Sequence, residues 1–280
     1  MPQPLDPDEI LAVAQLLDDP SDDVRYAVDL RVRSWTVEVL DVIDSVLAET
    51  ADPQLAAALE ELYLRQHEHF ARIAWHEVLG ARPVNLERGV LALAYFAQPR
   101  LRVAAWQARL DAMAETLKPR VAGREGVERA VSLFEGFGAL GYGGAQSDYY
   151  DPQHSYLNWV IEHKRGLPIT LSVLFTLIGW RLSVPVFGVN MPAHFICKYE
   201  DGRTEAFFDL FYGSGPLSRD EVAQRLVSRG LLPDASYFLS ATPDQILRRM
   251  VRNLVRAAEQ RGDAEAAQRW QSLARPWERP

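Results

Sequence analysis

The sequence predicts a mostly helical α+β protein, in which a small antiparallel sheet packs on a buried central helix behind an N-terminal helical array. Apolar residues recur at helical spacing from residue 7 to about residue 119, which is typical of consecutive amphipathic helices. Residues 169–182 are apolar on nearly every face, and such a helix belongs in the middle of a domain. Short apolar runs follow at 185–189, 193–199 and 205–211, and we interpret them as strands.

Several helix boundaries are marked by local signals. Asp52-Pro53 combines a helix stop with a plausible new N-cap, and Asn85 is predicted to cap the next helix. Pro168 suits the first position of a helix, where its missing N–H costs nothing. Capping boxes predict two further helix starts, at Ser218 with Glu221 and at Thr242 with Gln245. We therefore divide the chain into an N-terminal helical region (1–85), a core domain (86–240) and a C-terminal helical pair (241–280).

A glycine-rich stretch lies between Gly136 and Gly144. It is not a phosphate-binding loop, because no Gly-Lys-Ser/Thr follows and no strand is predicted before it. We interpret it as a loop between two helices.

Asp201-Gly202 stands between two predicted strands and predicts a hairpin with a two-residue type I′ turn. In that register Lys198 faces Glu205, an ion pair that favours this pairing over a slipped one. The same register sets His194 opposite Asp209, with Cβ atoms about 5 Å apart. Histidine and aspartate at this separation form two-thirds of a nucleophile–His–Asp constellation. The pair also has a purely structural interpretation, as a hydrogen-bonded contact that holds the hairpin.

Composition narrows the possible partners and compartment. The chain has 280 residues, a net charge of −8, and no run of Lys or Arg long enough to follow a phosphate backbone, so we expect no nucleic acid partner. No stretch approaches about 18 consecutive apolar residues, and the acidic N-terminus lacks the basic flank of a signal peptide, so we expect no membrane association. The single cysteine, Cys197, fits a reducing compartment, and the expected location is the cytoplasm.

The histidines of the helical region do not predict a metal site. His67 and His69 diverge by about 200° on a helix and cannot easily share an ion. His69 and His76 share a face, but no third ligand stands near them in the sequence. We expect neither a metal nor a cofactor.

Several motifs together resemble the SirB-type branch of the transglutaminase-like, papain-like superfamily. They are Asn85-Leu-Glu-Arg-Gly-Val, Tyr149-Tyr-Asp-Pro, Ser155-Tyr-Leu-Asn158, Arg165-Gly-Leu-Pro-Ile-Thr-Leu171, Met191-Pro-Ala-His-Phe195, Phe208-Asp-Leu-Phe211 and Gln245-Ile-Leu-Arg-Arg-Met-Val-Arg-Asn-Leu254. The resemblance implies a degenerate transglutaminase-like core with an N-terminal helical region and a short tetratricopeptide-like tail. Two residues depart from the family pattern: His154 replaces a usual Asn, and Leu210 replaces a usual Pro.

The resemblance also implies where a nucleophile would stand. In this superfamily a Cys at a helix N-terminus is activated by the helix dipole and by His, while Asp orients the imidazole. Laid back without gaps from Pro185, the position of that Cys falls on Pro168. Proline has no nucleophilic atom and no backbone N–H to offer to an oxyanion. The acid–base pair is therefore present and the nucleophile is missing.

Other side chains were considered as replacements for it. Cys197 is three residues from His194 on one strand, so the two side chains point to opposite faces and Cys197 is interpreted as a small buried residue. Thr170, in the first turn of the buried helix, is the best remaining candidate, and its alternative role is a hydroxyl bonded back to the helix start. Ser172 lies on a stripe with Thr176 and Gly179 that favours close packing.

A polar and aromatic segment leads into the helix before Pro168. We predict that five of its residues line a ligand pocket beside His194 and Asp209, although the segment is also compatible with a capped turn. These residues are Tyr149, Tyr150, Asp151, His154 and Asn158.

Three functions remain open from sequence. The first, which we favour, is a binding or regulatory module that has lost acyl-transfer chemistry and holds a peptide, a protein segment or a small ligand. The second is a hydrolase or acyltransferase with Thr170 as nucleophile, His194 as base and Asp209 as its orienter. The third is a helical adaptor that binds its partner through the first 120 residues.

Overall fold

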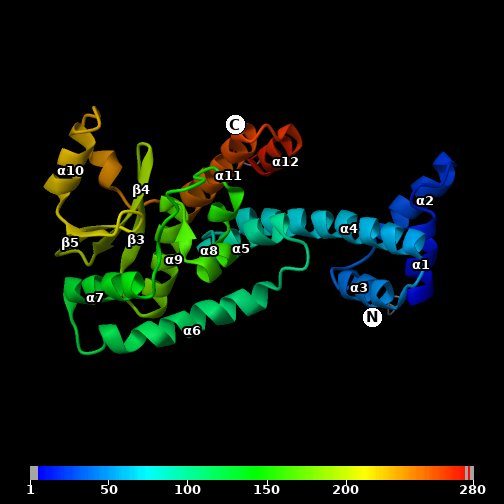
Figure 1. The fold of residues 1–280 in the computed structure, drawn as a ribbon, viewed down its shortest axis with the longest axis horizontal. Helices are drawn as coiled ribbons and strands as arrows, with labels where there is room; N and C mark the ends of the chain where they lie inside the picture. Colours follow the sequence, from blue (N-terminus) through cyan, green and yellow to red (C-terminus); the bar gives the residue numbers. More distant parts are fainter. Residues whose placement is uncertain (1–5, 275–276, 278–280) are drawn as a thin grey trace. The chain divides into compact units, whose positions relative to one another are not determined.

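The computed structural model describes residues 6–274 and residue 277 (Figure 1). The chain divides into two compact units. One contains the residues up to 76 together with 96–100, and the other contains 77–95 and the residues from 101 onward.

The first unit is a helical array. It comprises α1 (Pro7–Gln15), α2 (Asp22–Val32), α3 (Val39–Glu49) and most of α4 (Pro53–Gly80). The predicted start at Asp52-Pro53 is confirmed, since α4 begins at Pro53 and the Asp52 carboxylate accepts a hydrogen bond from the Gln54 amide at 2.9 Å. The core of the array contains fully buried Ile10, Ile43 and Leu59.

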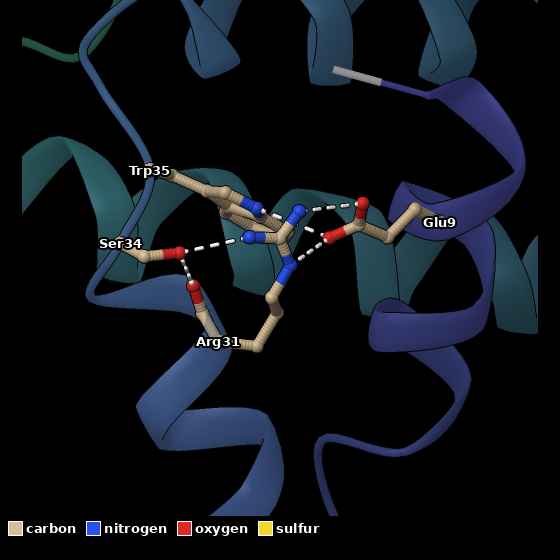
Figure 2. A network of polar contacts seen from close by, with 4 residues as sticks. All are labelled: Glu9, Arg31, Ser34 and Trp35. Atoms are coloured by element: carbon tan, nitrogen blue, oxygen red, sulfur yellow. Dashed lines mark hydrogen bonds and ion pairs between the residues drawn. The ribbon is translucent and has the colours of Figure 1, made fainter. Parts of the chain in front are cut away.

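A polar network connects α1 with α2 (Figure 2). The Arg31 guanidinium donates to both carboxylate oxygens of Glu9, with Nη2 2.8 Å from Oε2, and Nη1 donates to the Ser34 hydroxyl at 2.9 Å. The Trp35 indole N–H reaches the same carboxylate at 3.3 Å. These hydrogen bonds, with that from Arg31 the strongest, hold the pKa of Glu9 below its ordinary value.

The second unit is also rich in helices, and it contains the sheet. Its helices are the first ten residues of α5 (Leu86–Ala97), α6 (Val103–Val121), α7 (Gly126–Ala139), η1 (Pro152–Ser155), α8 (Leu157–His163), α9 (Pro168–Arg181), α10 (Arg219–Val227), η2 (Ala235–Phe238), α11 (Pro243–Gln260) and α12 (Ala264–Ala274). Pro168 is the first residue of α9, as predicted, and both predicted capping boxes form, at Ser218 for α10 and at Thr242 for α11. Asn85 accepts a hydrogen bond from the Arg88 amide at 2.9 Å, which confirms it as a cap.

The interpretation of the glycine-rich stretch as a loop was wrong for much of its length. Gly136 and Gly138 lie inside α7, and Gly143–Gly144 forms the short strand β1. A Cβ at Gly136 would lie 2.8 Å from a methyl carbon of Leu117 and 2.7 Å from the Arg120 side chain. Gly136 therefore lets α6 and α7 approach closely, a role that its low helix propensity conceals in the sequence.

The main sheet is antiparallel with four strands in the order β3-β4-β5-β6. These are β3 (Val186–Met191), β4 (His194–Glu200), β5 (Glu205–Asp209) and β6 (Ser214–Leu217). A separate two-stranded parallel sheet joins β1 to β2 (Arg165–Gly166). The strands β1, β2 and β6 were not predicted.

The predicted hairpin exists, but its register was wrong by two residues. Lys198 faces Phe207 rather than Glu205, and the connection contains four residues, 201–204. The Asp201 carboxylate accepts hydrogen bonds from the amides of Arg203 at 2.9 Å and Thr204 at 2.8 Å. Gly202 has a φ of +84°, whereas Asp201 does not have a positive φ, so the two positive φ angles of a type I′ turn are not both present. The Asp201 side chain thus stabilises a wider loop.

The sheet lies between α9 on one face and α10 with η2 on the other (Figure 1). Buried residues follow each other from Pro168 to Gly179 along α9, which confirms the predicted central helix. A Cβ at Gly179 would lie 2.2 Å from a Val186 methyl carbon, so this glycine permits the contact between α9 and β3. The structure confirms the predicted fold class, a mostly helical α+β protein with a small antiparallel sheet on a buried helix.

Candidate functional site

His194 and Asp209 form a buried pair at the ends of two neighbouring strands. His194 begins β4, Asp209 ends β5, and Nε2 of the imidazole lies 2.8 Å from Oδ2 of the carboxylate. The other carboxylate oxygen accepts hydrogen bonds from the amides of Phe211 at 3.1 Å and Tyr212 at 3.2 Å. Both side chains are less than a tenth exposed, and the carboxylate is satisfied on both oxygens.

The predicted pairing of these two residues survives the register error. The β4–β5 ladder ends at Cys197 and Phe208, so His194 and Asp209 lie beyond its last pair and do not face each other directly. Side chains alternate between sheet faces with a period of two, and a slip of two residues leaves every side chain on its predicted face. A slip of one residue would have separated the pair.

Aromatic rings flank His194. Its imidazole centroid is 5.6 Å from the ring of Tyr212 and 6.4 Å from the ring of Phe211, which meets it edge to face. Because Nε2 contacts Asp209, Nδ1 is the nitrogen left to contact another group, and within the described residues it makes no hydrogen bond. The ring is therefore oriented by Asp209 and held in place by its neighbours.

No nucleophile-bearing side chain is hydrogen-bonded to His194 in the described part of the chain. Pro168 occupies the first position of α9 and is buried. The Thr170 hydroxyl is also buried and has no hydrogen-bond partner in that part of the chain, so it bonds neither to His194 nor, as the alternative interpretation expected, to the start of the helix. The Ser172 hydroxyl is likewise buried without a partner.

Cys197 packs against α9. Its thiol donates to the Ser172 carbonyl at 3.3 Å and lies 3.8 Å from the Thr176 hydroxyl. Burial raises the pKa of the Cys197 thiol to about 12, which leaves it protonated near neutral pH. This agrees with its interpretation as a small buried residue.

The segment from Asp148 to Asp151 forms a capped turn. The Asp151 amide donates to the Asp148 carbonyl, and the Asp151 carboxylate accepts from the Gln153 amide, both at 2.9 Å, which caps η1. Tyr149 and Tyr150 are 41% and 36% exposed, with ring centroids 5.5 Å apart. The turn therefore holds two neighbouring aromatic rings that are each partly exposed.

His154 and Asn158 are buried, unlike those tyrosines. The His154 ring meets the Trp159 ring at 4.9 Å, and its Nδ1 has no hydrogen-bond partner in the described residues. Burial lowers the pKa of His154, against the opposing influence of Asp151 and Asp148, so the neutral imidazole is favoured. Asn158 lies in the first turn of α8.

A cavity of about 760 Å³ opens beside this histidine. Its wall contains His154, Trp159 and Arg165, the segment from Gly141 to Ser147, Gly138, and the residues from Phe211 to Gly213. His194 and Asp209 do not line it, but the aromatic neighbours of His194, Phe211 and Tyr212, do. Of the five predicted pocket residues only His154 is in this wall, while Tyr149, Tyr150, Asp151 and Asn158 are not.

Three residues of the cavity were not identified from sequence. The Arg165 guanidinium donates to the Gly141 carbonyl at 2.6 Å and the Lys164 carbonyl at 3.0 Å, so it is fixed against the glycine-rich segment. Trp159 stacks on His163 at 4.2 Å, and Tyr212 is 56% exposed. The available signals were modest: Arg165 stands in the motif before Pro168, and Tyr212 directly follows another aromatic residue.

Neither a metal-binding cluster nor a membrane-spanning helix occurs among the described residues. Across residues 6–274 and 277, no three or more His, Cys, Asp or Glu side chains are grouped so that they could hold a metal ion. Over the same residues, the helices are too short or too polar to cross a membrane.

Comparison with known proteins places the chain in a family. The family model described as the transglutaminase-like superfamily matches residues 104–252, just over half of the chain. The chain belongs to the transglutaminase-like superfamily. A UPF0162 protein of Xylella fastidiosa is 37% identical over 124 residues, which are 42% of this chain and 44% of that protein. F-box only protein 21 of Mus musculus is 28% identical over 130 residues, 44% of this chain and 20% of that protein.

The chain therefore matches less than half of the length of these two curated relatives. No solved structure matches it significantly. The matched family region contains α9, the hairpin, the His194–Asp209 pair and the cavity beside His154.

Proposed function

We propose that this transglutaminase-like protein is a non-catalytic binding or regulatory module of the SirB type. Pro168 stands where a catalytic member has its cysteine, and the cavity beside His154 holds a peptide segment or a small ligand. The proposed module spans residues 86–240, with the helical region 1–85 and a truncated tetratricopeptide-like pair at 241–280 as its flanking parts. We further propose a cytoplasmic location and a protein or peptide partner, without nucleic acid.

The arrangement around His194 supports a loss of acyl-transfer chemistry. Nucleophilic catalysis requires a base within about 3 Å of the nucleophile, or one water away. Among the described residues the Thr170 hydroxyl makes no hydrogen bond, and the Cys197 thiol is bonded to the Ser172 carbonyl of α9. Asp209 is fully used by His194 and by two backbone amides, which is a sound structural role for the pair.

The observation that carries the proposed binding function is the His154 imidazole. Its Nδ1 is buried, lacks a partner among the described residues, and belongs to a side chain in the wall of the cavity. A buried polar atom without a hydrogen bond costs about 1–3 kcal/mol, so it calls for an explanation. A ligand that turns the ring and then donates a hydrogen bond to Nδ1 would recover this cost, and Trp159 beside it supplies an aromatic surface.

An activity assay tests the loss of chemistry. We expect the purified chain to release no p-nitrophenol from p-nitrophenyl acetate, and to transfer no amine to a glutamine-containing peptide, above the rate of a heat-denatured sample. Turnover that disappears in His194→Ala would contradict the proposal. A thiol-alkylating reagent is expected to change nothing, because Cys197 is buried.

A ligand screen tests the binding function itself. Di- and tripeptides that raise the melting temperature of the wild-type chain are expected to lose this effect in His154→Phe, which removes the acceptor and keeps an aromatic ring. The matched control is His163→Phe, because the His163 ring also contacts Trp159 but does not line the cavity. Ligands that bind both variants equally would contradict a site at His154.

The second candidate function is a hydrolase or acyltransferase with a hydroxyl nucleophile. It is favoured by one observation: Asp209 orients His194 through Nε2, which leaves Nδ1 as a potential base. If the assay above shows turnover, Thr170→Val should abolish it and Thr176→Val should not. Turnover that survives Thr170→Val would exclude this nucleophile.

A further inference from the structure

Helix α11 carries four arginines within nine residues. Arg248, Arg252 and Arg256 recur every fourth residue and are exposed, whereas Arg249 is half-buried. None of the four forms an ion pair with another described residue. Other arginines of the same unit are neutralised, including Arg181 by Glu87 and Asp111, Arg219 by Glu205, and Arg261 by Asp148.

Arg249 places one of these charges beside the turn that precedes His194. Its Nη1 donates to the Met191 carbonyl at 2.8 Å and to the Asn190 side-chain oxygen, and its guanidinium carbon is 5.6 Å from the centroid of the Phe195 ring. Met191 ends β3, and after two intervening residues the chain enters β4 at His194. The contacts of Arg249 with described residues are thus neutral groups and a ring, and none of these residues supplies a carboxylate to balance its charge.

The exposed tyrosines of the capped turn lie against the same helix. The guanidinium carbon of Arg256 is 6.0 Å from the centroid of the Tyr150 ring, and η1 packs on α11. Burial lowers the pKa of Arg249, and the nearby charge of Arg252 lowers it further, while Tyr149 raises it. Arg249, Arg252 and Tyr149 are therefore neighbours. Tyr149 also lies near the neighbours of His194. Its ring centroid is 6.3 Å from that of Phe211, and the Phe211 ring in turn meets the His194 imidazole.

We propose that Arg249, Arg252 and Arg256, together with Tyr149 and Tyr150, form a docking surface for an acidic peptide segment of a protein partner. We call these five residues the arginine–tyrosine surface. The inference deepens the proposed function and rests on it, because it names the class of segment that the binding module recognises.

Charge and composition both favour an acidic segment. The guanidinium groups of Arg249, Arg252 and Arg256 form no ion pair with a described residue. They present donors that match carboxylates, with which Arg forms strong, bidentate pairs. Tyrosine and arginine are enriched at the centres of protein interfaces, where they supply rigid contact area together with hydrogen bonds. The surface therefore combines the charge and the aromatic contacts that a peptide with acidic and apolar residues requires.

The size of the surface favours a peptide over nucleic acid. From Arg249 to Arg256 the helix rises by about 10 Å, which corresponds to about three residues of an extended peptide. A polyanion would extend beyond this short stretch over a chain whose net charge is −8, and would be repelled there. Two or three carboxylates fit the surface better.

Fluorescence anisotropy with a labelled decapeptide of alternating Glu and Leu tests the inference. We expect the wild-type chain to bind this peptide, to ignore the Lys-Leu counterpart, and to bind at least tenfold more weakly after Arg252→Glu with Arg256→Glu. Both positions are exposed on a helix, and Glu has a helix propensity close to that of Arg, so the double variant should fold. The matched control is Arg203→Glu with Arg229→Glu, two exposed positions that change the net charge equally and should bind as the wild type does.

Three results would overturn the inference: no binding of the acidic peptide, equal binding by the two double variants, or preferential binding of a decathymidine oligonucleotide or of phosphatidylserine vesicles. If the double variant Arg252→Glu with Arg256→Glu proves unfolded by circular dichroism, Arg256→Gln alone should still weaken binding of the acidic peptide about threefold. The peptide screen with His154→Phe separates this outcome from the proposed function. One combination of results would contradict only the arginine–tyrosine surface: a cavity ligand binds in a way that depends on His154, but the acidic peptide does not bind. The proposed function as a binding module would then still hold.

Discussion

Two buried histidines of this chain occupy very different surroundings. His194 and His154 are both 6% exposed, yet His194 has a carboxylate partner at 2.8 Å, while Nδ1 of His154 has no partner among the described residues. The hydroxyls of Ser155 and Thr170, in η1 and in the first turn of α9, share this lack of a partner. The difference teaches that the catalytic-looking pair is held by its own hydrogen bond, whereas η1 and the first turn of α9 contain buried polar atoms without a partner among the described residues.

The largest expected effect on stability comes from removing the carboxylate partner of His194, so that its imidazole is left without a partner as Nδ1 of His154 is. Asp209→Ala removes the carboxylate and leaves the imidazole and the amides of Phe211 and Tyr212 without their acceptor. Removing one member of a buried pair costs about 3–5 kcal/mol, so we expect a loss of this size in the free energy of unfolding, measured by urea denaturation. Asp209→Asn retains an acceptor and should lose clearly less. Equal losses would mean that the hydrogen bonds to Asp209 contribute little.

A smaller effect of opposite sign is expected at Thr170. Thr170→Val keeps the shape of the side chain and removes a buried hydroxyl that has no partner, so it should raise the free energy of unfolding by about 1 kcal/mol. Thr176→Val is the matched control on the same helix. The Thr176 hydroxyl lies 3.8 Å from the Cys197 sulfur, so its removal should lower the free energy of unfolding slightly. If Thr170→Val destabilises the chain more than Thr176→Val does, the Thr170 hydroxyl is bonded in solution.

The smallest effect is a pH dependence that originates at His154. Burial lowers its pKa in the folded state below the ordinary value of 6.5, so the unfolded chain binds the proton more readily. The contribution of His154 to stability is therefore complete above about pH 6.5 and decreases as the pH falls toward the lower folded pKa. His154→Gln should flatten this part of the curve of melting temperature against pH. A curve as steep as that of the wild type would assign the dependence to another group.

Sequence patterns predicted the elements that repeat over many residues. The buried helix with Pro168 at its start and the capping boxes at Ser218 and Thr242 followed from periodicity and from local hydrogen bonding. The hairpin connection is an element that such patterns predicted incorrectly. Asp-Gly indicated a two-residue turn, but the Asp201 carboxylate bonds two loop amides and stabilises a longer one, a choice between local hydrogen bonds that sequence does not decide.

The cavity could not be predicted because its wall is built around very short strands. β1 and β2 contain two residues each, too few for any periodicity, and they bring Gly143 beside Arg165. Among the predicted pocket residues, only His154 reaches the wall, since Tyr149 packs near Phe211 and Tyr150 near Arg256, outside the cavity. Proximity in sequence to a helix start was thus a poor guide to where these side chains point.

The amide of Gly144 has a consequence for how this part of the fold opens. It donates to the Phe211 carbonyl at 3.1 Å, while the next amide, of Ala145, donates to Gly166 at 3.1 Å. One short stretch of backbone thereby ties the chain just after β5 to the chain just before α9. Protons on these two amides should exchange with deuterated solvent at a common rate, because neither can be released by fraying at a single end.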